Sequence, residues 1–264
     1  MEALTGDHIF LADPEAGEAP ARLARFESVM TDDERVRQAR LVFPRDRVAF
    51  AVTRALVRTV LSRYAPVAPQ DWRFAAGPHG RPHVVAPAGV DAPSFSVSHT
   101  AGLIICLVSK QERAAVDVER IRPLDDALAI AERHFAPDEV AALRACGDQR
   151  ARGQMFFALW TLKESFLKAL GRGFSLPLDA VTFALADGRR GTVGLDPAHA
   201  DLDFTWDFQL WRPSPEHRLA LARAVPAGAP APATKFFRVV PFETPEATLL
   251  ADAWSIGEIY RVGT

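Results

Sequence analysis

A run of helices followed by strands occurs twice along this 264-residue chain, over about 31–110 and again over about 114–225. Helices and strands that are grouped in this way, and do not alternate one by one, are typical of α+β domains. We therefore predict an α+β fold with two halves that face each other, residues 1–113 and 114–225. The Pro- and Ala-rich stretch 226–233 is typical of a linker, so 226–264 is predicted to be a linker with a C-terminal appendage.

Two end signals mark the helices of the first half. Thr31 and Glu34 form a capping box, in which the hydroxyl accepts from a first-turn amide and the carboxylate returns to the cap, and the helix it opens runs to about residue 42. Pro44 suits the first turn of a second helix, which continues to about residue 64. In the second half, helices are predicted at about 124–134, 137–146 and 153–170.

Short strands with alternating or continuous apolar residues are predicted at about 71–76, 82–86, 93–98, 103–109 and 114–120. The run Leu103–Ser109 is almost entirely apolar, so we expect it to be a central strand or one covered on both faces. The connections around it are short, which predicts that the last three strands form a meander. Strands return between 180 and 225.

The charge balance excludes several classes of function. The chain has 31 Lys and Arg residues against 33 Asp and Glu, a formal charge of −2. A chain near neutrality lacks the overall field that holds nucleic acid or an anionic membrane, so we expect neither as a partner, and any anion site must be local.

The chain is expected to be a soluble cytoplasmic protein. Its N-terminus has no basic start followed by an apolar core, and no apolar run approaches the length of a membrane span. Cys106 and Cys146 lie in unlike settings, without the spacing of a metal site or a disulfide framework, and are predicted to be reduced thiols.

Two carboxylates share one face of the predicted strand 114–120. In Val116-Asp-Val-Glu119 the period of two places both valines on one face and Asp117 and Glu119 on the other. Paired carboxylates repel each other unless a cation lies between them, and a hard divalent ion is the usual solution. A solvated strand end would show the same pattern, and the pattern alone leaves both interpretations open.

The helix 153–170 places Trp160, Glu164 and Lys168 on one face at i, i+4 and i+8. A surface salt bridge beside an aromatic residue is the ordinary interpretation of this face. Only four of the 31 basic residues are lysines, however, and Lys163 and Lys168 both fall in this helix. The use of lysine at these two positions, in a chain that otherwise uses arginine, indicates that a compact ammonium is needed there. Such a group suits Mg²⁺ and phosphate chemistry beside a carboxylate. Gly171 and Gly173 are placed to end the helix.

One strand end is a candidate for phosphate binding. Ser98 and His99 end a predicted strand, and a hydroxyl and an imidazole there can hold a phosphate, but Ser and His are common near turns. Taken alone, Gly80-Arg-Pro82 is a simple turn. A Ser/His hydrolase is disfavoured, because the sequence has no Gly-x-Ser-x-Gly elbow.

Together these segments resemble the 4′-phosphopantetheinyl transferases of the Sfp type. The motifs that carry the resemblance are Phe95-Ser-Val-Ser-His99, Val116-Asp-Val-Glu119, Trp160-Thr-Leu-Lys-Glu-Ser-Phe-Leu-Lys-Ala-Leu-Gly-Arg-Gly173 and Ser175-Leu-Pro-Leu-Asp179, in this order and spacing. The resemblance covers about residues 31–225. The glycine that relatives have before Asp-x-Glu is replaced here by Ala115-Val116.

The resemblance implies an enzyme that moves the 4′-phosphopantetheine arm of coenzyme A to a serine of an apo acyl or peptidyl carrier protein and releases adenosine 3′,5′-bisphosphate. It places Asp117, Glu119 and Glu164 around Mg²⁺, or Mn²⁺, on the pyrophosphate. Asp117 belongs to the catalytic set, Glu164 is the candidate base, and Lys168 is expected to stabilise phosphate charge, with Lys163 a weaker candidate for that task.

The resemblance also implies contacts with the adenosine 3′-phosphate. Ser98 and His99 correspond to family contacts with that group, and Arg81 stands where many relatives have a lysine. Arg37 is carried over from the first helix, although Arg35 and Arg40 are within one turn of it.

Relatives of this length are pseudo-dimers with the site between their two α+β halves, so a monomer is expected to suffice. Two alternatives stay open: an idle module that binds coenzyme A or a carrier protein, and a metal-dependent phosphohydrolase that uses the same acids. Carrier proteins have acidic surfaces and are recognised by shape and rim charge, so the sequence does not identify which one, or which pathway, is served.

Overall fold

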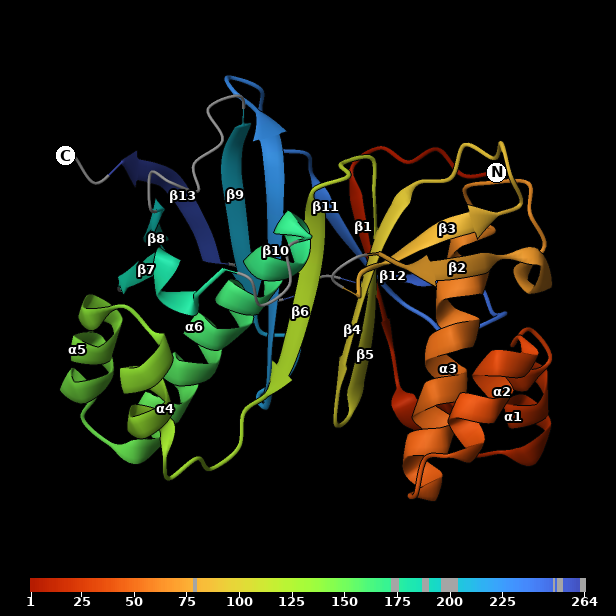
Figure 1. Cartoon of the computed structure of the whole chain (residues 1–264), viewed down its shortest axis with the longest axis horizontal. Coiled ribbons are helices and arrows are strands. Elements are labelled where there is room, and N and C mark those ends of the chain that lie inside the picture. The colour runs from red at the N-terminus through yellow and green to blue at the C-terminus, as the bar shows by residue number, and fades with distance from the viewer. Residues whose placement is uncertain are drawn as a thin grey trace. The chain divides into compact units, whose positions relative to one another are not determined.

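The structure is a computed structural model that describes residues 1–77, 80–171, 176–186, 190–195, 204–248, 250 and 254–261. These residues form two compact units, one of Met1–Glu112 with Pro232–Leu249 and the other of Arg113–Ala231 with Leu250–Thr264. Each unit combines helices with a sheet, which confirms the predicted α+β class (Figure 1). Gly173 and Ser175 of the helix motif lie outside the described residues.

The first unit is built on a five-stranded sheet with the order β12-β11-β1-β5-β4. Its elements are β1 (Asp7–Ala12), η1 (Pro14–Gly17), α1 (Pro20–Glu27), α2 (Asp32–Ala39), α3 (Pro44–Leu61), η2 (Pro69–Asp71), β2 (Arg73–Ala76), β3 (Pro82–Ala86), β4 (Ser94–Thr100), β5 (Leu103–Ser109), β11 (Thr234–Arg238) and β12 (Glu246–Thr248). β2 and β3 pair separately as a two-stranded sheet. Every residue of β5 is buried, because this strand lies between β1 and β4, as its apolar sequence predicts.

The helices of the first unit begin where their end signals place them. Thr31 and Glu34 make both hydrogen bonds of the capping box at the start of α2. Pro44 is in the first turn of α3. Proline has no amide hydrogen to donate, and an amide at this position would have no partner within the helix. One side of α3, including Val52, Leu56 and Val60, is buried in a core cluster with residues of β1 and β5.

The second unit is built on a six-stranded sheet with the order β6-β10-β9-β13-β8-β7. Its elements are β6 (Ala114–Arg120), α4 (Ala127–His134), α5 (Pro137–Ala145), α6 (Gln149–Leu170), η4 (Leu178–Ala180), β7 (Val181–Ala186), β8 (Arg190–Leu195), β9 (Phe204–Trp211), β10 (His217–Pro226) and β13 (Trp254–Arg261). Figure 1 shows α6 running beside β6 and β10, and the helix packs on both strands. Gly171 ends α6 in the left-handed conformation that glycine adopts without strain.

The prediction for residues 226–264 is wrong for the described part of that segment. β11 pairs in parallel with β1, so it is an inner strand of the first sheet, and β13 lies between β8 and β9 in the second. Each sheet is completed by strands that are far apart in the sequence. The sequence predicted neither the strand β1 nor its pairing with β11.

The predicted meander is also only partly correct. β4 and β5 form an antiparallel hairpin, but β6 leaves the first sheet and pairs with β10. Both cysteines are free thiols, as predicted, and among the described residues no helix is long and apolar enough to cross a membrane. That the two units are similar halves of a pseudo-dimer stays a prediction.

Candidate active site

Strand β6 presents its two carboxylates toward helix α6. Ala115, two residues before Asp117 and therefore on the same face, belongs to the core cluster that contains the buried residues of α6. The side chain of Asp117 is almost fully buried, and that of Glu119, nearer the strand end, is partly exposed. The alternation inferred from the sequence therefore places both acids beside the helix.

Lys168 is the cation of this cluster. Its Nζ lies 2.5 Å from Oδ1 of Asp117, and the lysine side chain is 35% exposed while that of the aspartate is 5% exposed. The ammonium charge also lowers the pKa of both Glu119 and Glu164, opposing larger effects that raise them. Three carboxylates from β6 and α6 thus surround one lysine.

The acids perturb one another as closely packed carboxylates do. Burial, and then the charges of Asp117 and Glu164, raise the pKa of Glu119 from 4.5 to about 7. Burial and the Asp117 charge also raise the pKa of Glu164. Below pH 7 the cluster therefore holds protons that an exposed set of acids would release.

This perturbation predicts how the stability of the metal-free protein depends on pH. The pKa of Glu119 is higher in the folded chain, about 7 against 4.5, so its contribution to stability is full below pH 4.5 and is lost as the pH rises through about 7. Urea unfolding in the presence of a chelator should therefore show a free energy of unfolding that falls over this window. Glu119→Gln should flatten that dependence, and an unchanged slope would contradict the perturbed pKa.

A metal ion fits the cluster by the chemistry of its donors. Carboxylate oxygens are the ligands that Mg²⁺ and Mn²⁺ prefer, and Asp117, Glu119 and Glu164 together carry a charge that needs a cation. Among the described residues, no three acidic, histidine or cysteine side chains stand in a ready-made metal cage. In this structure the cation in contact with Asp117 is the Lys168 ammonium.

Lys163 does not belong to this cluster, which corrects its predicted role in coenzyme A binding. Its side chain is fully buried, with Nζ 2.8 Å from a Glu139 carboxylate oxygen and hydrogen-bonded to the carbonyls of Leu178, at 2.7 Å, and Val181. The Glu139 carboxylate also accepts from the Phe183 amide at 2.8 Å. The charges of Lys163 and Glu139 are thus paired with each other inside the core. Through these contacts Lys163 joins α5, α6 and the start of β7.

Trp160 also has a core role. Its ring stacks on Phe156 with the centroids 5.7 Å apart, and a tilted contact reaches Phe135 at 6.2 Å. The face of α6 that carries Trp160, Glu164 and Lys168 therefore has two parts. Trp160 packs against Phe135 at the C-terminal end of α4, and Glu164 and Lys168 follow one and two turns later.

The first unit contains a hollow lined by arginines, with a volume of about 660 Å³. Its charged and basic lining consists of Asp32, Asp33, Glu34, Arg37, Arg54, Arg58, Arg73 and His99. Four guanidinium groups on α2, α3 and β2 outnumber the three acids of its wall, of which Asp32 and Asp33 are exposed and Glu34 is partly buried. A hollow of this composition suits a phosphate-bearing ligand.

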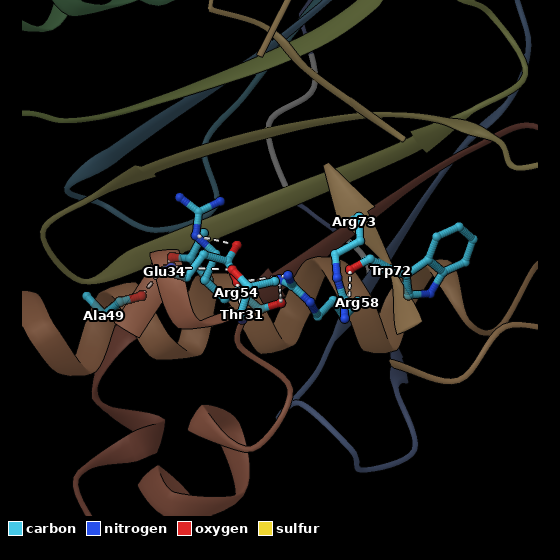
Figure 2. Close-up of polar contacts among 8 residues, drawn as sticks. Thr31, Glu34, Ala49, Arg54, Arg58, Trp72 and Arg73 are labelled. Atoms are coloured by element: carbon cyan, nitrogen blue, oxygen red, sulfur yellow. Dashed lines mark hydrogen bonds and ion pairs between the residues drawn. The ribbon is translucent and has the colours of Figure 1, made fainter. Parts of the chain in front are cut away.

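Glu34 holds two of these arginines in place. Its carboxylate oxygens lie 2.8 Å from Nη2 of Arg58 and 3.6 Å from Nε of Arg54, and Figure 2 shows the carboxylate joined to both guanidinium groups. Burial lowers the pKa of both arginines, with Glu34 opposing the effect, but a guanidinium stays charged under any physiological condition. The charge of Arg37 also lowers the pKa of Arg54, so these two groups are neighbours.

The three residues expected at the 3′-phosphate have different surroundings in the first unit. His99 and Val97 line the arginine hollow, whereas Ser98 projects from the opposite face of β4 and is buried. Arg81 lines a second hollow of about 530 Å³ that also contains Glu112. The Arg81 Nη2 atom lies 3.4 Å from Oγ of Ser94 there. The structure thus brings Arg37 and His99 to one hollow, and the roles expected of Ser98 and Arg81 at the phosphate stay predictions.

Sequence reasoning missed Arg54, Arg58 and Arg73 as candidates. The i, i+4 spacing of Arg54 and Arg58 was a usable signal, because it puts both on one helix face. Arg73 gave no signal of its own. It reaches the hollow because η2 and the start of β2 return to α3, and its charge lowers the pKa of Arg58.

Known proteins resemble this chain over most of its length. A family model described as the 4′-phosphopantetheinyl transferase superfamily matches residues 113–222. The chain is 30% identical over 202 residues to 4′-phosphopantetheinyl transferase Sfp of Bacillus subtilis strain 168, covering 76% of this chain and 85% of that protein.

Two further relatives agree. The chain is 30% identical over 220 residues to the Bacillus subtilis 4′-phosphopantetheinyl transferase ffp, covering 83% of this chain and 91% of that protein. It is 28% identical over 204 residues to 4′-phosphopantetheinyl transferase HetI of Nostoc sp., covering 77% and 85%. Because these matches span nearly the whole of each relative, the chain belongs to the 4′-phosphopantetheinyl transferase superfamily and is an enzyme of the Sfp type.

Proposed function

We propose that this enzyme transfers the 4′-phosphopantetheine group of coenzyme A to a serine hydroxyl of an apo carrier protein, with Mg²⁺ bound, and releases adenosine 3′,5′-bisphosphate. The observation that carries the proposal is the grouping of Asp117, Glu119, Glu164 and Lys168 on β6 and α6. Relatives named 4′-phosphopantetheinyl transferases, 30% identical over most of the chain, support the class of reaction.

The reaction replaces one phosphate bond by another. The serine oxygen bonds to the phosphorus that carries the pantetheine arm. The bond from that phosphorus to the bridging oxygen breaks, and this oxygen leaves with adenosine bisphosphate. The serine proton goes to a base, for which we propose Glu164. Burial and the Asp117 charge raise the pKa of Glu164, and a carboxylate with a raised pKa is a better proton acceptor.

Glu164→Gln tests the role of the base, because it keeps the shape of the side chain and loses the proton acceptor. Turnover should fall by about a hundredfold or more, which is the usual contribution of a general base. Single-turnover measurements would separate this loss from a change in coenzyme A affinity. Unchanged turnover with weaker coenzyme A binding would remove Glu164 from the role.

Asp117, Glu119 and Glu164 would hold Mg²⁺, or Mn²⁺ in its place. The ion, when bound, supplies positive charge that polarises the phosphate oxygens and stabilises the leaving group. Lys168 would then have a different partner: its ammonium, which donates to Asp117 in this structure, is 35% exposed and would turn toward a phosphate oxygen.

We propose that the arginine hollow binds the adenosine 3′-phosphate of coenzyme A. Arg37 and His99, both expected at this group, line the hollow together with Arg54 and Arg73. Glu34 holds Arg54 and Arg58 in position before the ligand arrives, which lowers the entropy cost of binding.

Dephospho-coenzyme A lacks only the 3′-phosphate, and so it tests this assignment. The wild type should prefer coenzyme A, and Arg37→Ala or His99→Ala should narrow the preference. One charge-assisted hydrogen bond contributes about 1.5–3 kcal/mol, equivalent to roughly ten- to a hundredfold in the ratio of kcat/KM values.

A matched control for this prediction is Arg22→Ala in α1, which removes an exposed arginine that pairs with Glu243. It should leave the preference unchanged. Equal losses on both substrates in the Arg37 and His99 variants would show that the hollow supports the fold and does not bind the phosphate.

The direct test of the function is mass spectrometry of an apo carrier protein incubated with the enzyme, coenzyme A and Mg²⁺. A gain of one phosphopantetheine group on the carrier serine supports the proposal. Hydrolysis of coenzyme A without a carrier product would indicate a metal-dependent phosphohydrolase, and binding without either product would indicate an idle module.

We further propose a monomer that acts in the cytoplasm, because one chain supplies both the acid cluster and the arginine hollow. Light scattering in dilute solution tests the monomer. Initial rates with a panel of apo acyl and peptidyl carrier proteins would identify the preferred partner.

A further inference from the structure

Exposed large apolar side chains gather at the end of α2 and in the connection from α2 to α3. Five large apolar side chains are exposed among the described residues, and three of them lie here: Val36 in α2 at 50%, and Val42 at 77% and Phe43 at 54% in the connection. A single exposed apolar residue needs no explanation, but a group of them marks a contact surface. We call residues 35–47 the α2–α3 corner.

Hydrogen bonds from side chains hold the α2–α3 corner in one shape. The Gln38 amide donates to the Glu27 carboxylate at 2.7 Å and to the Arg47 carbonyl at 3.1 Å. The Nε atom of Arg47 donates to the Leu41 carbonyl at 2.8 Å. Phe43 itself is the N-cap residue of α3, directly before Pro44. The exposed rings and methyl groups are therefore presented without the entropy cost of ordering a loose loop.

The α2–α3 corner is strongly basic in a chain whose net charge is −2. Within it stand five arginines and one acid: Arg35, Arg37, Arg40, Arg45, Arg47 and Asp46. The guanidinium of Arg45 is 5.3 Å from the centre of the Phe43 ring, and the Arg45 side chain is 82% exposed. An apolar centre with a polar rim is the usual composition of a protein docking surface, and the positive sign of this rim fits an acidic partner.

We propose that the α2–α3 corner is the surface on which the acidic carrier protein docks. Phe43 and Val42 would enter an apolar depression on the carrier, and Arg40 and Arg45 would face its acidic side chains. This inference rests on the proposed function, because that function supplies an acidic protein as the second substrate. It adds the place and the residues of docking, which are separate from the acid cluster.

Steady-state kinetics with varied apo carrier protein at saturating coenzyme A tests the proposal. Phe43→Ala should raise the KM for the carrier about tenfold, as loss of a central aromatic contact does, and should leave the KM for coenzyme A unchanged. The matched control is Val85→Ala, which shortens an exposed apolar side chain of β3 and should change neither value.

Charge reversal provides a second test that does not depend on the apolar contact. Arg40→Glu with Arg45→Glu should raise the carrier KM at low salt by about tenfold or more, and the difference from the wild type should shrink at high salt, because ions screen exposed charges. Both side chains are exposed, and circular dichroism should confirm the native fold.

The outcomes separate this inference from the proposed function. If the wild type transfers the group and both sets of variants keep its carrier KM, the docking surface is wrong while the function stands. If the wild type modifies no carrier protein, both fail. A dimer in the wild type that Phe43→Ala converts to a monomer would assign the corner to a second copy of the chain. Tighter binding of an oligonucleotide than of the carrier would assign it to nucleic acid. Either result overturns the proposal.

Discussion

Asp117→Ala is expected to abolish group transfer while leaving the free energy of unfolding nearly unchanged. The substitution removes the carboxylate that lies 2.5 Å from Lys168 and that we propose as a metal ligand, so turnover should fall by on the order of a thousandfold or more. Stability should change little for two opposing reasons. The ion pair is lost, but the Asp117 charge that raises the pKa of Glu119 and Glu164 is lost as well.

Water also limits the cost of this substitution. The Lys168 side chain is 35% exposed, so its ammonium can be solvated when its partner is removed. Transfer rates and urea unfolding would be measured on the same preparation, with Asp125→Ala as the control, since Asp125 is an exposed acid hydrogen-bonded to Gln149. A variant that unfolds would make Asp117 a structural residue. A variant with wild-type rates would remove it from the reaction.

Lys163→Met should have the largest effect on stability. Both partners of the Lys163–Glu139 pair are 0% exposed, and removing the lysine leaves a buried carboxylate without its cation. Breaking a buried ion pair in this way costs about 3–5 kcal/mol. We expect the midpoint of urea unfolding to fall accordingly, while the KM for coenzyme A in the remaining folded protein is unchanged.

The double variant Lys163→Met with Glu139→Gln separates charge from packing. Glutamine removes the unpaired charge and keeps an acceptor for one of the two backbone amides, those of Ala136 and Phe183, that bond to the Glu139 carboxylate, so part of the lost stability should return. A different result would contradict the place of Lys163 in the core. Normal stability of Lys163→Met together with a raised KM for coenzyme A would restore Lys163 to phosphate binding.

The features that the sequence determined are local. The alternation of Asp117 and Glu119 on β6 follows from the two-residue period of a strand, and the capping box of Thr31 and Glu34 follows from the geometry of one helical turn. The apolar run of β5 predicted a buried strand and the structure confirmed it. In each case the side chains that matter are within a few residues of one another, so their relative position is set by the backbone period alone.

The tertiary structure decided which of two similar residues belongs to which environment. Lys163 and Lys168 are five positions apart on one helix, so the helix period puts them on different sides, but it does not show which partner each side meets. Glu139, which lies 24 residues before Lys163, and the carbonyl groups that follow α6 draw the first lysine into the core, whereas β6 supplies Asp117 to the second. Their partners come from other elements of the unit, and only the packing of those elements brings them within reach.

The same reason explains the arginine hollow and the C-terminal strand. Arg73 joins Arg54 and Arg58 because η2 returns the chain to α3, and β11 becomes an inner strand because the edge of β1 is available to it more than 200 residues away. Pairing between distant segments depends on which edges and faces are left uncovered once the whole chain has folded. The sequence by itself determined the elements and the motifs of this enzyme, and the tertiary structure decided which charges meet.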